Sequence, residues 1–127
     1  MKRILIVDDE PHVARVLKLT LGPRGYQVES LSDPRLAMEM LRGFAPDVLI
    51  TDIQMPGMSG RELCEQIQAQ MPERAFLVMV MTSMASCESR DWVHRMPGIE
   101  FVEKPLSPRG LAARLDAHFA QTAASAA

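Results

Sequence analysis

The segment "ILIVDDEPHV", residues 4–13, places four branched aliphatic residues directly before three acidic ones. The apolar run predicts a buried strand, and the proline after the acids is favoured in the first turn of a helix. Glu10 stands where a helix-capping residue stands, because a side-chain oxygen there accepts bonds from free N–H groups. Asp8 and Asp9 are more than one cap requires. The segment therefore predicts a strand-to-helix junction that carries two carboxylates for another purpose.

The same alternation of an apolar run and a helical pattern recurs along the chain. Apolar runs predict five strands, at residues 2–7, 26–30, 47–51, 76–81 and 99–102. Helical spacing between the runs is seen for Val13, Val16, Leu17 and Leu21, for Ala37, Met40, Leu41 and Phe44, for Leu63 and Ile67, and for Leu111, Leu115 and Phe119. The stretch 86–96, which contains Trp92, predicts one further helix.

Start and stop signals accompany these helices. Asp33 and Ser107 are each followed by a proline, the pairing of a capping residue with a proline at the first helical position. Gly22, Gly25 and Gly43 fall where helices are expected to stop.

Repeated strand-helix units imply right-handed crossovers and a parallel sheet with helices on both faces. A chain of 127 residues is long enough for one domain with a hydrophobic core. We therefore expect an α/β fold, a doubly wound five-stranded parallel sheet. Such sheets bind ligands at the carboxyl ends of their strands, where the strand order reverses.

Composition excludes several classes of function. A net charge of -2 and a pI near 5.9, with no basic run, argue against direct binding to nucleic acid. Cys64 and Cys87 lack metal-ligand spacing and are expected to be reduced thiols. The chain enters a strand at once and has no membrane-length apolar stretch. We expect a cytoplasmic protein that binds no membrane.

Polar residues follow four of the predicted strands. Asp8 and Asp9 follow the first, Asp52 the third, Thr82 the fourth and Lys104 the fifth. Because parallel strands end at one edge of the sheet, these side chains are expected to converge. Three carboxylates together repel one another unless a positive charge lies among them, which predicts a hard divalent cation such as Mg²⁺.

A metal ion, a lysine and a hydroxyl are what a phosphoryl group needs during transfer. An aspartate can itself be the nucleophile and form an aspartyl phosphate. Asp52 is the best candidate, because it stands alone at a strand end and precedes "IQMPGMSG", a proline- and glycine-rich stretch that predicts a tight surface loop.

The chain resembles a response-regulator receiver domain of two-component signalling, of the chemotaxis-regulator kind. The motifs that carry the resemblance are "VDDE", "TDIQMPGMSG", "MTS" and "EKP", and it extends over residues 2 to about 119. It implies a flavodoxin-like (βα)5 fold with strand order 2-1-3-4-5. The receiver domain would span residues 1–119, with 120–127 as a flexible tail or the start of a linker.

The resemblance also implies the residues of the site. Asp52 would be the phosphoacceptor, and Asp8, Asp9, Asp52 and the main-chain carbonyl of Gln54 would hold Mg²⁺ or Mn²⁺. Gln54 would also stand beside the acceptor, where its side chain could tune the access of water.

Four other residues match the family's switch and packing positions. By resemblance, Thr82 would be the switch hydroxyl, Lys104 the ion-pairing lysine and Phe101 the mobile aromatic, while Gly60 would allow close packing. Alternatives remain for two of them. An ordinary strand-end residue would explain Thr82, and apolar alternation alone would place Phe101 in the core.

The implied function is a phosphorylation-dependent switch. A sensor histidine kinase or histidine phosphotransfer protein would donate the phosphoryl group. The signal would pass through the face formed by 86–96, 99–102 and the last helix to an output domain, a target protein or a second copy of the chain. The domain would assist its own phosphorylation without being an enzyme. Either it stands alone or it belongs to a longer chain.

Two alternatives remain. A Mg²⁺-dependent aspartyl-phosphate phosphohydrolase would also use an aspartate nucleophile, but it carries D-x-D after its first strand, where this chain has adjacent aspartates. A receiver-like module that is not phosphorylated would act by protein contact alone.

Overall fold

The computed structural model describes residues 2–53, 55, 57–82, 98–103 and 107–126. The elements within these residues follow one another in the order β1 (Arg3–Val7), α1 (Pro11–Leu21), η1 (Gly22–Arg24), β2 (Gln27–Leu31), η2 (Pro34–Leu36), α2 (Ala37–Phe44), β3 (Val48–Asp52), α3 (Gly60–Gln70), β4 (Leu77–Thr82), β5 (Ile99–Glu103) and α4 (Pro108–Ala126). Every strand lies within one residue of its predicted bounds. The helix expected over 86–96, with Trp92, lies outside the described residues.

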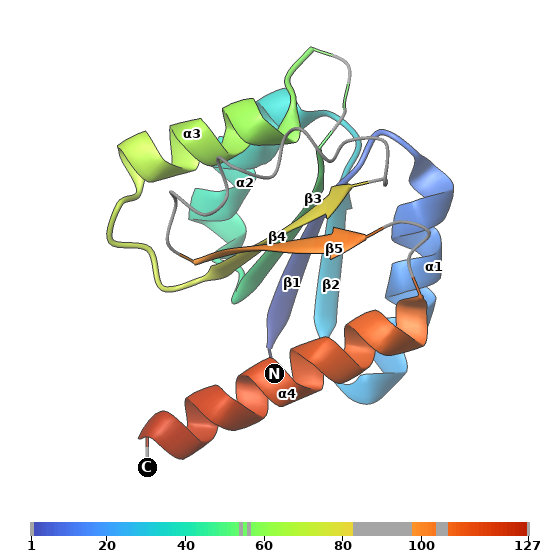
Figure 1. Ribbon diagram of the computed structural model, residues 1–127. Coiled ribbons are helices and arrows are strands. Elements are labelled where there is room, and N and C mark those ends of the chain that lie inside the picture. The colour runs from blue at the N-terminus through green and yellow to red at the C-terminus, as the bar shows by residue number, and fades with distance from the viewer. Residues whose placement is uncertain (1, 54, 56, 83–97, 104–106, 127) are drawn as a thin grey trace.

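The five strands form one parallel sheet in the order β2-β1-β3-β4-β5 (Figure 1). This confirms the doubly wound, flavodoxin-like prediction. After β1 the chain passes through α1 and forms β2 on one side of β1. After α2 it forms β3 on the other side of β1. The strand order therefore reverses between β1 and β3, which lie side by side with Val7 opposite Thr51.

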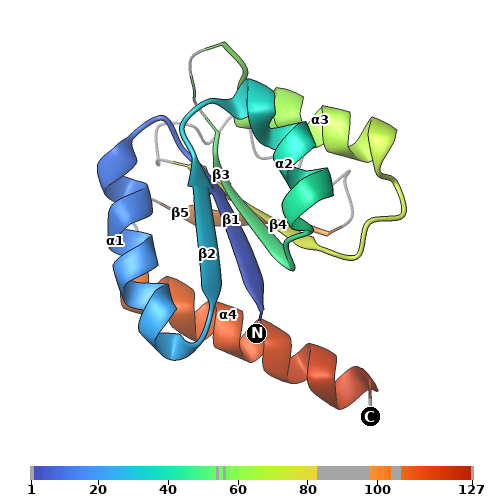
Figure 2. The same ribbon diagram turned by 180° about the vertical axis from the view of Figure 1, so that it is seen from behind.

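Helices cover both faces of the sheet. α1 and α4 lie on one face, and α2 and α3 lie on the other (Figures 1 and 2). Alternation along β1 divides its side chains between the two layers. Ile4 and Ile6 pack with α1 and α4, whereas Leu5 and Val7 pack with α2 and α3. Covering on both faces explains why all five residues of β3 are buried.

Both predicted caps are confirmed. The Asp33 carboxylate accepts a hydrogen bond from the Arg35 N–H at 3.0 Å, and the Ser107 hydroxyl accepts one from the Gly110 N–H at 3.1 Å. Gly43 as a helix stop is wrong. It lies inside α2, and the residue that ends this helix is Ala45, in the left-handed conformation with a φ of 51°.

One predicted core position of α1 is also wrong. Val16 is 44% exposed, while Ala14, which the periodicity did not select, is buried. Leu17 and Leu21 are buried as predicted. The helix is therefore rotated so that its contact stripe runs through the small residue.

The last helix is longer than expected. α4 continues to Ala126 and so includes most of the stretch 120–127, which the sequence analysis assigns to a flexible tail or the start of a linker. The physical reason is composition, because the stretch "AQTAASAA" is rich in alanine, the strongest helix former. In the part of the chain that the structure describes, no helix combines the length and apolar character needed to cross a membrane.

α4 is fastened to the chain between α1 and β2. The Tyr26 hydroxyl donates to Asp116 on α4 at 2.5 Å, and Arg24 pairs with the same carboxylate at 2.7 Å. The Tyr26 ring lies 5.7 Å from that of Phe119, over which the Lys2 ammonium is placed at 5.3 Å. These contacts hold the middle of α4 against the amino end of the sheet.

The hydrogen bond between Tyr26 and Asp116, here called the clamp, predicts that the stability of the domain changes at alkaline pH. Burial, and next the hydrogen bond to Asp116, raise the pKa of Tyr26 from 10.0 to about 12. A raised folded-state pKa gives stability that is complete below pH 10 and is lost as the pH rises through 12. We expect Tyr26→Phe to cost about 1 kcal/mol at neutral pH. The variant should also lose this part of the decline above pH 10.

Urea unfolding of both proteins from pH 7 to 11 measures these effects. Tyr26 is the only tyrosine in the sequence, so the phenolate absorbance of the folded protein reports this residue alone. A phenol that titrates at its ordinary pKa in the native state would contradict the clamp.

Candidate functional site

The candidate site lies at the carboxyl edge of the sheet, beside the reversal of strand order. Asp8 follows the last residue of β1, and Asp52 is the last residue of the neighbouring β3. Both side chains are buried, Asp8 to 1% exposure and Asp52 to 6%, whereas Asp9 is partly exposed. The predicted convergence of the three aspartates is confirmed. One ligand oxygen from each lies within 4.8 Å of the others.

Local hydrogen bonds fix the Asp8 carboxylate. The Asp8 N–H donates to the Leu31 carbonyl at 3.0 Å, which extends the pairing of β1 with β2 by one residue. Its Oδ1 accepts the Glu10 N–H at 2.9 Å. The expected capping role of Glu10 is therefore wrong. Glu10 occupies the capping position, but its side chain makes no capping hydrogen bond, and Asp8 binds the neighbouring N–H instead.

The backbone at Asp52 is held from two sides. The Ile53 N–H donates to the Met81 carbonyl of β4 at 3.0 Å, and the Gly60 N–H donates to the Ile53 carbonyl at 2.9 Å. A Cβ placed on Gly60 would lie 2.3 Å from the Asp52 carbonyl oxygen. Ser59 caps α3 by accepting the Glu62 N–H at 3.1 Å. The first residue of α3 thus packs directly on the main chain of Asp52.

The three carboxylates suit a hard divalent cation. Mg²⁺ prefers oxygen ligands at about 2.0 to 2.1 Å, so two ligands of one ion are at most about 4.2 Å apart. A group whose oxygens lie within 4.8 Å needs only small side-chain rotations to meet that limit. α1 begins at Pro11, and the positive end of its dipole faces the same junction. The residues present therefore fit Mg²⁺ or Mn²⁺.

The cluster predicts that Asp9→Ala stabilises the domain when metal is absent and makes it less stable than the wild type when Mg²⁺ is present. Without a divalent ion, we expect Asp9→Ala to raise the free energy of unfolding by about 1 kcal/mol, because it removes a repelling charge. At 100 times the Kd, Mg²⁺ should stabilise the wild type by about 2.7 kcal/mol. Most of that gain should be absent in the variant. Urea unfolding in chelator and in Mg²⁺ measures both effects.

Glu10→Ala is the matched control. Glu10 is the next acid in the chain, and among the described residues it is not part of the cluster. This variant should keep the Mg²⁺ response of the wild type. A full Mg²⁺ response in Asp9→Ala would rule out Asp9 as a ligand.

Of the four other predicted site residues, the structure describes two. Gln54 and Lys104 lie outside the described residues. The backbone of Thr82 ends β4, which lies beside β3, so its position at the carboxyl edge is as predicted. Phe101 lies on β5 with its side chain half-buried against the α2 and α3 layer.

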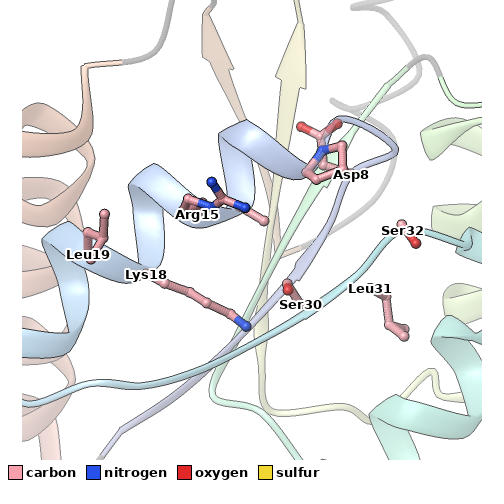
Figure 3. A pocket seen from close by; sticks show the side chains of 9 residues that line it. Asp8, Arg15, Lys18, Leu19, Ser30, Leu31 and Ser32 are labelled. Carbon is pink, nitrogen blue, oxygen red and sulfur yellow. The ribbon is translucent and has the colours of Figure 1, made fainter.

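Two features of the site were not found from the sequence. The Thr51 hydroxyl is fully buried and donates to the Asp52 carbonyl at 3.1 Å. A hollow of about 460 Å³ also opens beside Asp8, between α1 and β2, and Arg15 and Lys18 line it (Figure 3). In Figure 3 the Lys18 side chain extends from α1 toward β2. In a sequence, charged residues that line a hollow on a helix look the same as charged residues on any solvent-exposed helix face. No sequence signal therefore pointed to this hollow.

The arrangement of sheet, acidic cluster and strand-end residues agrees with comparison to known proteins. Residues 4–116 match the family model of the response regulator receiver domain. The chain belongs to this family. Receiver domains are the regulatory phosphoacceptor domains of two-component signal transduction.

Relatives share both the sequence pattern and the fold of this receiver domain. The probable transcriptional regulator ycf27 of Guillardia theta is 31% identical over 123 residues, which cover 95% of this chain and 46% of that protein. The CheY-like receiver domain protein of Methanospirillum hungatei is 26% identical, with a TM-score of 0.86 and 98% of each chain covered. The chemotaxis protein CheY4 of Vibrio cholerae is 28% identical, with a TM-score of 0.81, over 91% of this chain and 97% of that one.

The receiver domain spans half or less of the length of the curated relatives it matches. The covered share is 46% for ycf27, and 50% for the DNA-binding response regulator MtrA of Mycolicibacterium smegmatis. The activities of those whole proteins belong to chains that are longer than the region matched here.

Proposed function

We propose that this receiver domain is a phosphorylation-dependent switch that accepts a phosphoryl group on Asp52. One observation carries the proposal. The Asp52 carboxylate ends a central strand and shares a ligand-sized cluster with two further carboxylates, Asp8 and Asp9. A capping role needs no such convergence from two strands, whereas a phosphoacceptor beside a metal site does.

The donor is the phosphohistidine of a sensor histidine kinase or phosphotransfer protein. An Asp52 carboxylate oxygen attacks the phosphorus while the nitrogen–phosphorus bond breaks. The imidazole nitrogen keeps the electron pair of that bond and takes up a proton. Mg²⁺ or Mn²⁺, held by the three aspartates and the Gln54 carbonyl, supplies positive charge for the phosphoryl oxygens.

The chain's own residues complete the site in this proposal. The contact of Gly60 with the main chain keeps Asp52 at a fixed position during transfer. Lys104 pairs with the phosphoryl group, and the hydroxyl of Thr82 turns toward it once it has formed. That contact is charge-assisted, so it favours one of two packing arrangements.

The signal leaves through β5 and α4. The Arg114 guanidinium on α4 donates to the Phe101 carbonyl and pairs with the Glu100 carboxylate, both at 3.1 Å. Arg114 thus links α4 to the backbone of β5 at Phe101, so a repacking of Phe101 that shifts this backbone reaches α4 directly. An output domain, a target protein or a second copy of the domain would read that face.

Mapping the phosphoryl group tests this function. The protein is incubated with a small phosphodonor and Mg²⁺, and the adduct is located by mass spectrometry. We expect the wild type to carry phosphate on Asp52 alone, and Asp52→Asn to carry none. Asp47→Asn is the matched control, because Asp47 precedes the same strand at its amino end and bonds to the Arg3 N–H at 2.8 Å.

The control should be labelled like the wild type. Equal labelling of Asp52→Asn would show that another residue is the acceptor. A wild type that stays unlabelled with phosphodonors and with a cognate kinase would instead favour a module that acts by protein contact alone.

A further inference from the structure

β2 is an edge strand, because in the described part of the chain it pairs with β1 alone. Its main-chain groups alternate in direction. The Gln27 N–H and the Leu31 carbonyl bond to the β1 segment, at 2.9 and 3.0 Å. With the two-residue period of a strand, Val28 and Ser30 turn their N–H and carbonyl groups away from β1. This edge therefore presents two residues whose main-chain groups can pair with another strand.

On one side of this edge lies the α1 groove, the hollow between α1 and β2 seen in Figure 3. Arg15 and Lys18 line it from α1, Ser30 lines it from β2, and the buried Asp8 lines it from the junction after β1. Both cations are exposed, and neither makes an ion pair or hydrogen bond through its side chain with any described residue. The α1 groove thus offers positive charge beside the outward-facing Ser30.

On the other side lies the α2 groove, a hollow of about 550 Å³ between β2 and α2. Its apolar lining is formed by Leu31, Leu36, Met40 and Phe44. Leu36 is 49% exposed, and two carboxylates, of Glu29 and Glu39, stand at the same hollow. The α2 groove therefore combines an apolar floor with negative charge, the reverse of the α1 groove.

We propose that the β2 edge binds an extended segment of a partner protein, which adds to the sheet as a sixth strand. Residues opposite one another on neighbouring strands point to the same face. The segment therefore places a basic side chain opposite Glu29, an acidic one opposite Ser30 toward Arg15 and Lys18, and an apolar one opposite Leu31. Main-chain bonds at Val28 and Ser30 supply affinity, and the two grooves supply specificity.

A second copy of the chain does not have this chemistry. Two copies could pair their β2 edges antiparallel about a two-fold axis. If the main-chain groups of both Val28 and Ser30 are used, Val28 of one chain lies opposite Ser30 of the other. Glu29 then lies opposite Glu29 of the second chain. Like charges directly opposite one another destabilise a strand pair. The occupant is therefore a different chain that carries a basic-acidic-apolar triplet. Of the acidic cluster only Asp8 lines one of the two grooves, and the strand pairing itself needs neither metal nor phosphate. The inference therefore stands independently of the proposed function.

Peptide binding to the wild-type protein tests the inference. The peptide Thr-Thr-Lys-Glu-Leu-Thr-Thr carries the triplet in the order for a parallel strand, and the reversed sequence carries it for an antiparallel strand. The control peptide, Thr-Thr-Glu-Lys-Leu-Thr-Thr, has the same composition with Lys and Glu exchanged. At nine times the Kd, amide exchange at Val28 and Ser30 should slow about tenfold. Exchange at Gln27 and Glu29 should not change, because their N–H groups already bond to β1. Protection that is equal with the control peptide, or that is absent at Val28 and Ser30, would overturn the proposal.

Charge reversal tests the predicted triplet. Glu29→Lys should abolish binding of the Lys-Glu-Leu peptide and restore it for a peptide with Glu-Glu-Leu at the same place. Glu73→Lys, the same change at an exposed residue between α3 and β4, should bind like the wild type. A Glu29→Lys variant that prefers the original peptide would overturn the register. Without peptide, sedimentation must show no dimer that protects the Val28 and Ser30 amides from exchange, and such a dimer would make the second copy the occupant instead.

Discussion

Gly60→Ala is expected to destabilise the domain by on the order of 3 kcal/mol. The added Cβ would lie 2.3 Å from the Asp52 carbonyl oxygen and 2.8 Å from the Ile53 Cα. Both are main-chain atoms of a buried strand end, which cannot move aside as a flexible side chain can. Either α3 shifts away from the sheet or the backbone that carries Asp52 is displaced. Urea unfolding measures the cost, and the rate of labelling by a phosphodonor reports the displacement of Asp52.

Gly43→Ala is the matched control and has the opposite expected sign. Gly43 lies within α2, and a Cβ built there meets no atom within 4 Å. Replacing glycine by alanine inside a helix stabilises it by about 0.5 to 1 kcal/mol. If both substitutions had small effects of the same sign, the close contact of Gly60 with Asp52 would be wrong.

Leu17→Ala is expected to cost about 2 to 5 kcal/mol, the range for a leucine lost from a packed core. The Leu17 side chain is 1% exposed and packs in the layer between α1, α4 and the sheet. The loss combines the transfer of apolar surface with the cavity that remains. Thermal and urea unfolding should both show this loss of stability. The free energy of unfolding should fall with urea concentration at the same slope in the variant and in the wild type.

Leu19→Ala makes the same chemical change two residues further along α1. Leu19 is 70% exposed, so we expect its replacement to change the free energy of unfolding by less than about 0.5 kcal/mol. A cost at Leu19 similar to that at Leu17 would mean that α1 packs on the sheet with a different face.

Much of the site was predictable because it depends on where strands end. Apolar runs mark the strands, and parallel strands bring their carboxyl ends to one edge whatever covers them. Asp8, Asp9 and Asp52 were therefore placed together from the sequence, and the structure confirms it. The roles of Thr82 and Lys104 remain proposals, because they depend on where side-chain atoms lie.

Local signals failed where packing chose between equivalent residues. Periodicity favoured Val16 over Ala14 because hydrophobicity was its only criterion, while the closely packed helix turned the smaller residue inward. Glycine was expected to end α2 because it tolerates the left-handed conformation, yet Ala45 takes that conformation one residue after the helix. At Ala14, contacts between α1 and the sheet outweighed a weak local preference.

The sequence by itself determined the order of strands and helices, the parallel sheet and the convergence of three carboxylates, because all of these follow from hydrophobic pattern and chain direction. Only the tertiary structure decided which atoms touch. The hydrogen bond of Tyr26 to Asp116 joins residues 90 positions apart in the chain. The contact of Gly60 with the main chain of Asp52 and the two grooves beside β2 depend on where helices meet the sheet. Such contacts depend on how helices seat on the sheet, within a fraction of an ångström, and no local pattern records that distance.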